Sequence, residues 1–214
     1  MRGVSLTAVV VAAMTVGSAS SGGAEPQAVT LRFSVMRNGE PIGTSTVHLR
    51  QEGGRTLASA ATHIAVKFAS WTVYRFDQSE SEEFADGRLQ AMSSVTDDNG
   101  TVHRVAAQRR GDVLAVDADG KLTHVDPSLI PANPWNPLLI GKRIALNPQD
   151  GSVTPVAVTD HGEEQLMVEG RPLRAHHYSI AMSFPQDVWY DQRHQLVKVE
   201  LHGSDGSRIS YQPG

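Results

Sequence analysis

The sequence predicts an all-β protein: a single curved antiparallel sheet, or half-open barrel, with a short Pro-rich loop or helix covering its concave face. Three features support this fold class. Apolar and polar residues alternate along most of the chain, turns containing Gly with Asp or Asn interrupt the alternation at short intervals, and the central residues 131–142 are instead rich in proline and apolar residues. Alternation with a period of two is typical of half-buried strands, and closely spaced turns are typical of antiparallel hairpins.

The first strands follow this pattern closely. Residues 29–36 carry an apolar side chain at every second position, and Asn38 and Gly39 come directly afterwards. Asn-Gly is the strongest short hairpin signal, because both residues tolerate a positive φ. A second strand around residues 47–49 and a third over residues 56–69 continue the alternation.

Residues 71–76 (WTVYRF) form an unusual strand, because they are apolar on both faces. Trp71 and Val73 share one face, and Tyr74 and Phe76 share the other. Strands of this kind are typically buried on both sides. We therefore expect another segment of the chain to lie over the sheet here.

The later strands are each bounded by turn signals. By turn counting we expect about ten or eleven strands in the sheet. After the first four, the candidate strand segments from which this sheet would be built are residues 89–96, 101–108, 113–116, 121–125, 153–158, 165–168, 173–184, 187–190, 196–202 and 208–211.

Residues 131–142 are the segment best suited to cover the sheet. They enter as a proline-stiffened loop that carries Trp135. Asn136 then suits a helix N-cap, and Pro137 suits the first helical position, where the missing N–H costs nothing. The apolar residues 138–140 follow. We expect one or two helical turns that lie across the concave face.

The N-terminus has the layout of a secretory signal peptide. A basic start at Arg2 is followed by an uncharged apolar run, residues 3–16, and by small residues up to Ala24. The apolar run is too short to span a bilayer. We expect residues 1–24 to be a signal peptide and residues 25–214 to be a single β domain, periplasmic or secreted, with no transmembrane segment after cleavage.

The composition narrows the possible functions. The 214-residue chain has no cysteine and a net charge of −4. The lack of cysteine excludes disulfides, thiolate metal sites, a Cys nucleophile and a lipid-modified N-terminal Cys. The mildly acidic charge gives no support for binding nucleic acid. No phosphate loop or dinucleotide fingerprint indicates a cofactor, so none is expected.

No recognised catalytic or metal-binding motif is present. The nine histidines show neither the helical spacing of a zinc protease nor a compact cluster. His176 and His177 are neighbours on an expected strand, so they point to opposite faces, with His176 inward. We expect no catalytic residue and no metal ligand. A hydrolase or isomerase that pairs Asp187 or Asp191 with His194 or His176 remains an alternative.

Two acidic stretches have simple structural interpretations. Glu80, Glu82 and Glu83 are expected at a solvated strand end. Residues 97–100 (DDNG) are expected to be a hairpin turn, because they lack the alternating oxygen ligands and distal glutamate of a calcium loop.

The aromatic residues suggest a binding function. They are few, at 6%, yet most fall in segments expected to face the interior. A concave apolar cavity under the Pro-rich segment would accept a lipid or another apolar or amphipathic ligand, or an envelope protein partner. The alternative is a solid-core interaction module that pairs through a sheet edge. The residues expected to line the cavity are Phe68, Trp71, Tyr74, Trp135, Leu138, Leu139, Tyr178 and Trp189.

Short motifs in a fixed order also carry a family resemblance. They are NGEPIG (38–43), VKFASWTVYRF (66–76), TDDNG (96–100), PWNPLL (134–139), NPQDG (147–151), GEE (162–164), AHHYSI (175–180), VWYD (188–191) and RISYQ (208–212). In these the chain resembles a family of exported bacterial proteins described as domain of unknown function 6134. The family is similar in shape to periplasmic lipoprotein-carrier domains, whose curved sheet wraps apolar ligands under a small helical lid. The resemblance implies this fold but no particular activity.

Overall fold

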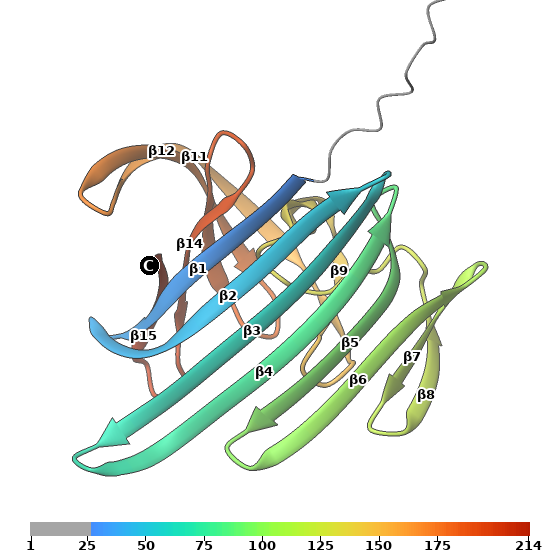
Figure 1. Ribbon diagram of the computed structural model, residues 1–214, viewed down its shortest axis with the longest axis horizontal. Coiled ribbons are helices and arrows are strands. Elements are labelled where there is room, and N and C mark those ends of the chain that lie inside the picture. Colours follow the sequence, from blue (N-terminus) through green and yellow to red (C-terminus); the bar gives the residue numbers. More distant parts are fainter. Residues whose placement is uncertain (1–26) are drawn as a thin grey trace, which may run out of the picture.

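The computed structural model describes residues 27–214, and the expected signal peptide lies outside the described residues. Within them, thirteen strands form one antiparallel sheet in the order β11-β12-β13-β14-β15-β1-β2-β3-β4-β5-β6-β7-β8, and β9 pairs with β10 in a separate hairpin (Figure 1). The all-β fold class is confirmed. The strands are β1(Gln27–Arg37), β2(Glu40–Glu52), β3(Arg55–Phe68), β4(Trp71–Ala85), β5(Arg88–Asp98), β6(Thr101–Arg110), β7(Val113–Ala118), β8(Lys121–Val125), β9(Ile144–Leu146), β10(Val153–Pro155), β11(Ala157–Val168), β12(Arg171–Ala181), β13(Gln186–Tyr190), β14(Leu196–His202) and β15(Arg208–Pro213).

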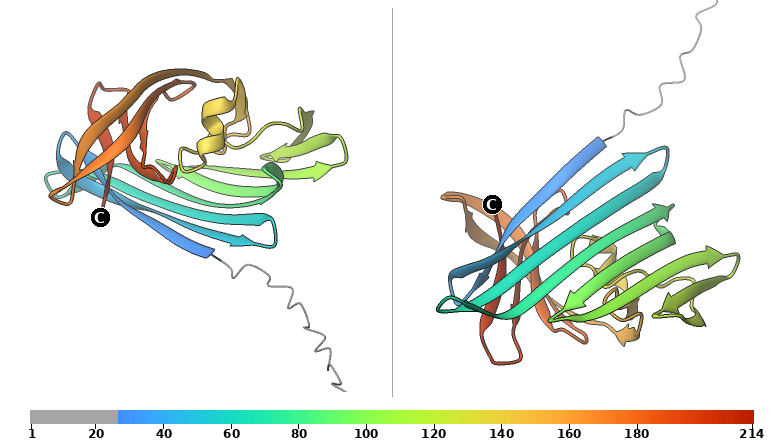
Figure 2. Two further views of the ribbon diagram at one scale, coloured as in Figure 1. Left: turned by 90° about the horizontal axis from the view of Figure 1, so that it is seen from above. Right: turned by 60° about the horizontal axis from the view of Figure 1, so that its bottom comes forward.

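The sheet bends strongly but does not close. Seen from above, strands β1–β6 form a floor, and the C-terminal strands β11–β14 curl up and over it (Figure 2). The two edge strands, β11 and β8, do not pair with each other within residues 27–214. The result is a half-open barrel, because nearly every connection is a short hairpin and each strand adds to the same twisted sheet.

The core lies on the concave side of the sheet. Alternate residues of each strand point inward, and the buried cluster joins the floor, the C-terminal strands and the segment between β8 and β9. Among its fully buried members are Leu89, Leu114, Leu129, Leu139 and Val188.

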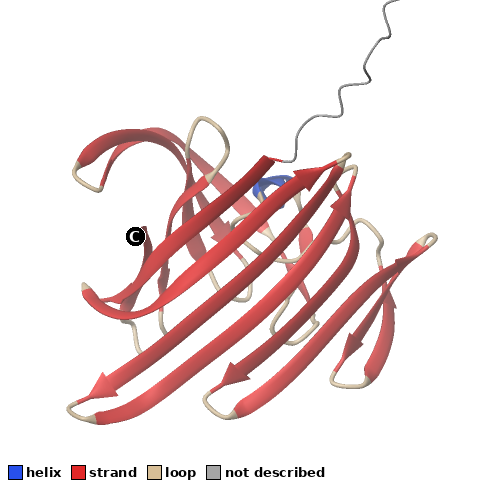
Figure 3. Cartoon of the chain, viewed as in Figure 1, coloured by secondary structure: helices blue, strands red, loops and turns tan. Residues whose placement is uncertain are grey.

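The Pro-rich segment covers the concave face as expected. Its five-residue 3-10 helix, η1(Pro137–Gly141), begins after Asn136, whose side chain accepts a hydrogen bond from the Leu138 backbone N–H at 3.1 Å (Figure 3). Leu139 is fully buried in the core. The Tyr190 hydroxyl donates to the Pro134 carbonyl at 2.7 Å, which fastens the segment to β13.

The stretch at residues 71–76 differs from the expectation. Trp71 is 75% exposed and Val73 is 55% exposed, so this part of β4 is not covered on both faces. The physical reason is strand length. β3 and β4 extend as a long hairpin beyond the covering segment, and their turn-proximal ends project from the body of the protein (Figure 1).

Candidate ligand cavity

A cavity of about 690 Å³ lies between the floor of the sheet, the C-terminal strands and the Pro-rich segment. Small-molecule pockets typically enclose about 300–1,000 Å³. Most of its wall is apolar, because the inward positions of β1–β4 and of β14 are mainly aliphatic or aromatic. Phe33, Val47, Ile64, Phe76 and Val199 are examples.

A polar row crosses the floor of the cavity. Ser45, Thr62, Gln78 and Thr96 lie side by side on β2 to β5, because each is the cross-strand partner of the next. The Ser45 and Thr62 hydroxyls are hydrogen-bonded at 2.9 Å. Polar side chains at consecutive inward positions interrupt an otherwise apolar surface, and burial of such groups is unfavourable unless they find partners.

Two carboxyl groups are buried beside this row. Glu80 and Glu82 are 7% and 5% exposed, and they point to the same face because they lie two residues apart on β4. The Asn133 side-chain amide donates to both carboxyl groups, at 2.6 Å to Glu80 and 2.5 Å to Glu82. Asn133 therefore ties the Pro-rich segment to the floor of the sheet.

The buried environment raises the pKa values of both Glu80 and Glu82. Burial raises the pKa of Glu80 to about 7, although the hydrogen bond from Asn133 acts in the opposite direction. Burial and the neighbouring charge of Glu80 raise the pKa of Glu82 well above its usual value. Two carboxylates this close in a low-dielectric site do not both ionise readily. The pair therefore carries a proton at neutral pH.

The inner end of the cavity offers both hydrogen-bond donors and an acceptor. Six buried side-chain polar atoms have no hydrogen-bond partner within residues 27–214, among them the Gln78 Nε2, the Glu80 Oε1 and the Trp135 Nε1. All three side chains line the cavity. The indole ring of Trp135 is held edge-on against Phe84, with 6.1 Å between ring centroids. Buried polar groups are normally paired, so these three atoms have unused hydrogen-bonding capacity beside the cavity.

The cavity reaches solvent at its other end. Val73 and Phe184, both 55% exposed, are part of its lining there, as is Tyr74. The ion pair between Arg37 and Asp205, at 2.5 Å, also borders this end. This end lies beside the projecting β3–β4 turn.

The structure brings only some of the expected residues to the cavity. Tyr74 and Trp135 line it, and Leu139 is in the adjoining core. Phe68 and Trp71 do not line it, because both are 75% exposed on the projecting hairpin. Leu138, on the outer side of η1, is exposed.

Tyr178 and Trp189 also lie away from the cavity. Tyr178 stacks on His176 at the inner face, with ring centroids 4.5 Å apart. Trp189 has the opposite orientation on β13 and stacks on His177 at the outer face. The two-residue alternation of neighbouring strands places them on different sides of the sheet.

The sequence interpretation of Glu80 and Glu82 was wrong. They are buried, while only Glu83 is partly open to solvent. The signal was present in the alternation: Phe76, Gln78, Glu80, Glu82 and Phe84 all occupy inward positions of one unbroken strand. The expectation of a solvated strand end rested on the charge of the glutamates, and it placed the end of β4 before these residues.

Within residues 27–214, no side-chain hydrogen bond joins Asp187 or Asp191 to His176, and none joins either of them to His194, whose backbone N–H donates to the Asp191 carbonyl. His176 is hydrogen-bonded to Asp160 at 2.6 Å on the inner face. Asp187 lies on the outer face beside His177. Asp191 accepts from the backbone of Arg193 and Gln195, and so shapes a turn.

Between residues 27 and 214, no helix is long and apolar enough to cross a bilayer.

A solved structure shares this fold. A crystal structure of a beta-barrel-like protein of domain of unknown function DUF1849, from Brucella abortus, is similar with a TM-score of 0.65 and 9% identity, over 86% of this chain and 94% of that chain. A sequence identity this low shows a similar fold and nothing about function. No curated protein matches the sequence. The family model described as Domain of unknown function (DUF6134) matches residues 33–214, and the chain therefore belongs to that family.

Proposed function

We propose that this protein is an exported, non-enzymatic binding protein that holds an amphipathic ligand in the cavity between the curved sheet and the Pro-rich segment. The observation that carries the proposal is the polar inner end of an apolar cavity. The side chains of Gln78, Glu80 and Trp135 line this region, and each carries a buried polar atom without a hydrogen-bond partner among the described residues. A site with apolar walls and a few convergent polar groups is typical of small-molecule binding.

The chemistry of these three atoms defines the ligand class. An amide N–H and an indole N–H donate, and a carboxyl oxygen accepts. A hydroxyl or amide group satisfies both requirements, because it donates and accepts at once. A carboxylate headgroup is disfavoured by the neighbouring Glu80 and Glu82, whose raised pKa values already reflect the cost of negative charge here. The ligand we propose is an acyl or alkyl chain with a neutral polar headgroup.

Export is part of the proposal. Residues 1–24 have the layout of a signal peptide, and the chain has no cysteine. These features support a periplasmic or secreted protein without a lipid anchor.

The cavity also separates this proposal from a solid-core interaction module. Such a module needs a filled interior, whereas about 690 Å³ is open here. A partner pairing with the edge strands β11 or β8 is compatible with ligand binding, but no feature of those edges identifies one.

The test is a binding series with ligands of one chain length and different headgroups. An alcohol, an amide and a carboxylate are titrated against the mature protein by competition with a fluorescent acyl probe. The alcohol and the amide are expected to bind at least about tenfold more tightly than the carboxylate at mildly alkaline pH, since each missing buried hydrogen bond costs about 1–3 kcal/mol.

Two variants locate the site. Gln78→Leu removes a donor from the inner end and is expected to weaken the binding of the alcohol and the amide about tenfold. Leu138→Ala is the control, because Leu138 is exposed on the covering segment and is not among the residues that line the cavity. Equal affinity of the wild type for all three headgroups, or an unchanged affinity of Gln78→Leu for the alcohol and the amide, contradicts the proposed headgroup site. Failure of every probe to bind contradicts the function itself.

A further inference from the structure

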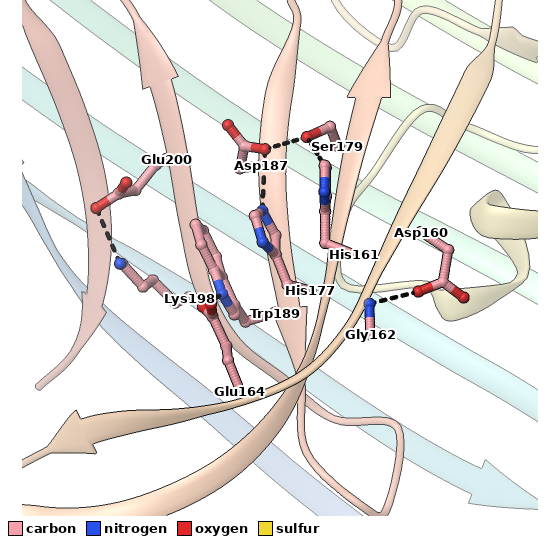
Figure 4. A network of polar contacts seen from close by, with 10 residues as sticks. All are labelled: Asp160, His161, Gly162, Glu164, His177, Ser179, Asp187, Trp189, Lys198 and Glu200. Atoms are coloured by element: carbon pink, nitrogen blue, oxygen red, sulfur yellow. Dashed lines mark hydrogen bonds and ion pairs between the residues drawn. The ribbon is translucent and has the colours of Figure 1, made fainter.

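A second polar cluster lies on the outer face of the sheet, across β11, β12 and β13. It contains His161, His177, Ser179 and Asp187, with Trp189 alongside (Figure 4). The inner-face neighbours of these residues face the core, so the cluster is on the opposite side of the sheet from the cavity. An inference about it is therefore independent of the proposed ligand binding.

A β-bulge builds the cluster. The pairing of β11 with β12 shifts between Asp160 and Gly162, which makes His161 the extra residue. Gly162 adopts φ +83°, and its N–H donates to the Asp160 side chain at 2.7 Å. A bulge re-aims the inserted side chain. Here it places the His161 ring against the His177 ring, with centroids 4.5 Å apart and planes inclined by 27°.

Strand register supplies the third group. Asp187 is the cross-strand partner of Ser179, one alternation along from His177 and Trp189. The His177 Nε2 lies 3.0 Å from the Asp187 Oδ1. The His161 Nε2 lies 2.8 Å from the Ser179 hydroxyl, which itself donates to the Asp187 Oδ1 at 2.5 Å. The His177 Nε2 thus meets the carboxylate directly, and the His161 Nε2 is connected to it through the Ser179 hydroxyl.

We propose that His161, His177 and Asp187 bind a first-row divalent metal ion, with Zn²⁺ as the representative. One ligand atom from each residue lies within 4.8 Å of the other two. Tetrahedral Zn²⁺ bonds to nitrogen and carboxylate oxygen at about 2.0–2.2 Å, so two of its ligand atoms are about 3.3–3.6 Å apart. Binding therefore requires the three side chains to draw their ligand atoms closer together around the ion.

The surroundings hold the ligands in place. The His177 ring stacks on Trp189 with centroids 4.3 Å apart and planes inclined by 10°, and Lys198 Nζ lies 4.2 Å from the centre of the Trp189 ring. The Trp189 Nε1 donates to Glu164. Neighbours that fix ring orientation in this way are a regular feature of metal-binding histidines.

Metal binding requires a charged carboxylate at Asp187 and an unprotonated nitrogen on each imidazole. Each histidine must carry its proton away from Nε2, on Nδ1 for the neutral ring, before that atom can bind the ion. Three protein ligands leave a fourth position for water.

The two histidines were missed in the sequence because they are far apart along the chain. No spacing rule connects them, since the contact depends on the bulge at Gly162 and on the register of three strands. The expectation of no metal ligand rested on spacing along the chain, which does not report on side chains brought together by the sheet.

The experiment is a titration of the metal-free mature protein with Zn²⁺ by calorimetry and with Co²⁺ by visible absorption. We expect one saturable site per chain and the absorption bands of a low-symmetry cobalt complex. Because His177 stacks on Trp189, Co²⁺ binding should also quench the emission of this tryptophan.

Matched variants decide the outcome. His161→Ala and His177→Ala should each weaken Zn²⁺ at least about tenfold, since changes even behind the ligands commonly cost 10–100-fold. His161 is exposed, so its removal leaves the fold intact even if His177→Ala does not. His176→Ala is the control, because this neighbouring histidine faces the other way. Unchanged affinity in His161→Ala, or no saturable binding to the wild type, overturns the proposal.

Discussion

At the scale of single residues, the buried pair Glu80 and Glu82 links the stability of this protein to pH. A carboxyl group with a raised folded pKa holds its proton in the folded state after the unfolded chain has lost it. The folded state then binds more protons than the unfolded state between the two pKa values, so the free energy of unfolding falls as pH rises through that window. For Glu80 the window runs from the usual glutamate value up to about 7, and the raised pKa of Glu82 extends it further.

Glu82→Gln tests this directly. The variant removes one buried acid and the like-charge repulsion that acts on Glu80. Relative to the wild type, its free energy of unfolding should increase as pH rises from about 5 to about 8, because the folded wild type keeps a proton that the unfolded chain loses in this range. Urea unfolding at a series of pH values measures the difference.

Glu83→Gln is the matched control for that series. Glu83 faces outward on the same strand and pairs with Arg55 at 3.1 Å, with its side chain 33% exposed. Exposed pairs contribute little, so this variant should follow the wild type closely at every pH. A Glu82→Gln profile parallel to the wild type would mean that the pair is not buried as described.

At the scale of secondary-structure elements, close backbone contacts fix how the long hairpins pack. Gly43 on β2 is the cross-strand partner of Ile64 on β3. A Cβ placed at Gly43 would collide with the His63 carbonyl oxygen and lie 2.8 Å from the Ile64 Cα. Both obstacles are backbone atoms, which cannot rotate away.

Gly43→Ala should therefore reduce the free energy of unfolding by about 1–3 kcal/mol, as overpacked sites do. Gly141→Ala is the control, since a Cβ there meets no atom within 4 Å. It should change stability by no more than about 0.5 kcal/mol. Equal unfolding midpoints for the two variants in urea would show that β2 and β3 pack less closely at this point.

The elements also show what the sequence can predict. Period-two alternation and Asn-Gly or Asp-Gly turns predict most strands, because they depend on neighbouring residues only. The cap at Asn136 and the helical turn after Pro137 were confirmed for the same reason. Local pattern does not encode how far a strand extends beyond the segment that covers it. This length determines that Phe68 and Trp71 are exposed and that Glu80 is buried.

Sites made of distant residues are harder still. Asn133 meets Glu80 and Glu82 across about fifty positions of sequence separation, and His161 meets Asp187 only through a bulge and three strands. Contacts of this kind follow from the register of the sheet. They become visible once the strands are placed, and not before.

At the scale of the whole molecule, an open and strongly bent sheet encloses a cavity, and the Pro-rich segment is attached to the sheet at one end of this cavity. The Pro-rich segment is attached to both sides of this enclosure: Asn133 to the floor and Pro134 to Tyr190 on the C-terminal strands. The cavity reaches solvent near Val73 and Phe184. This arrangement suits a carrier in which the chain of the ligand lies along the apolar walls and its headgroup lies at the inner end.

The most direct test is native mass spectrometry of the mature protein purified from the envelope of the cell that exports it, followed by organic extraction. The predicted result is an added mass that extraction identifies as an acyl or alkyl compound with a neutral polar headgroup. In Trp135→Ala this mass should be much reduced, and in Leu138→Ala it should be retained. A clean mass for the protein alone, unchanged after incubation with such compounds, would contradict the account and indicate that the cavity holds no ligand of this class.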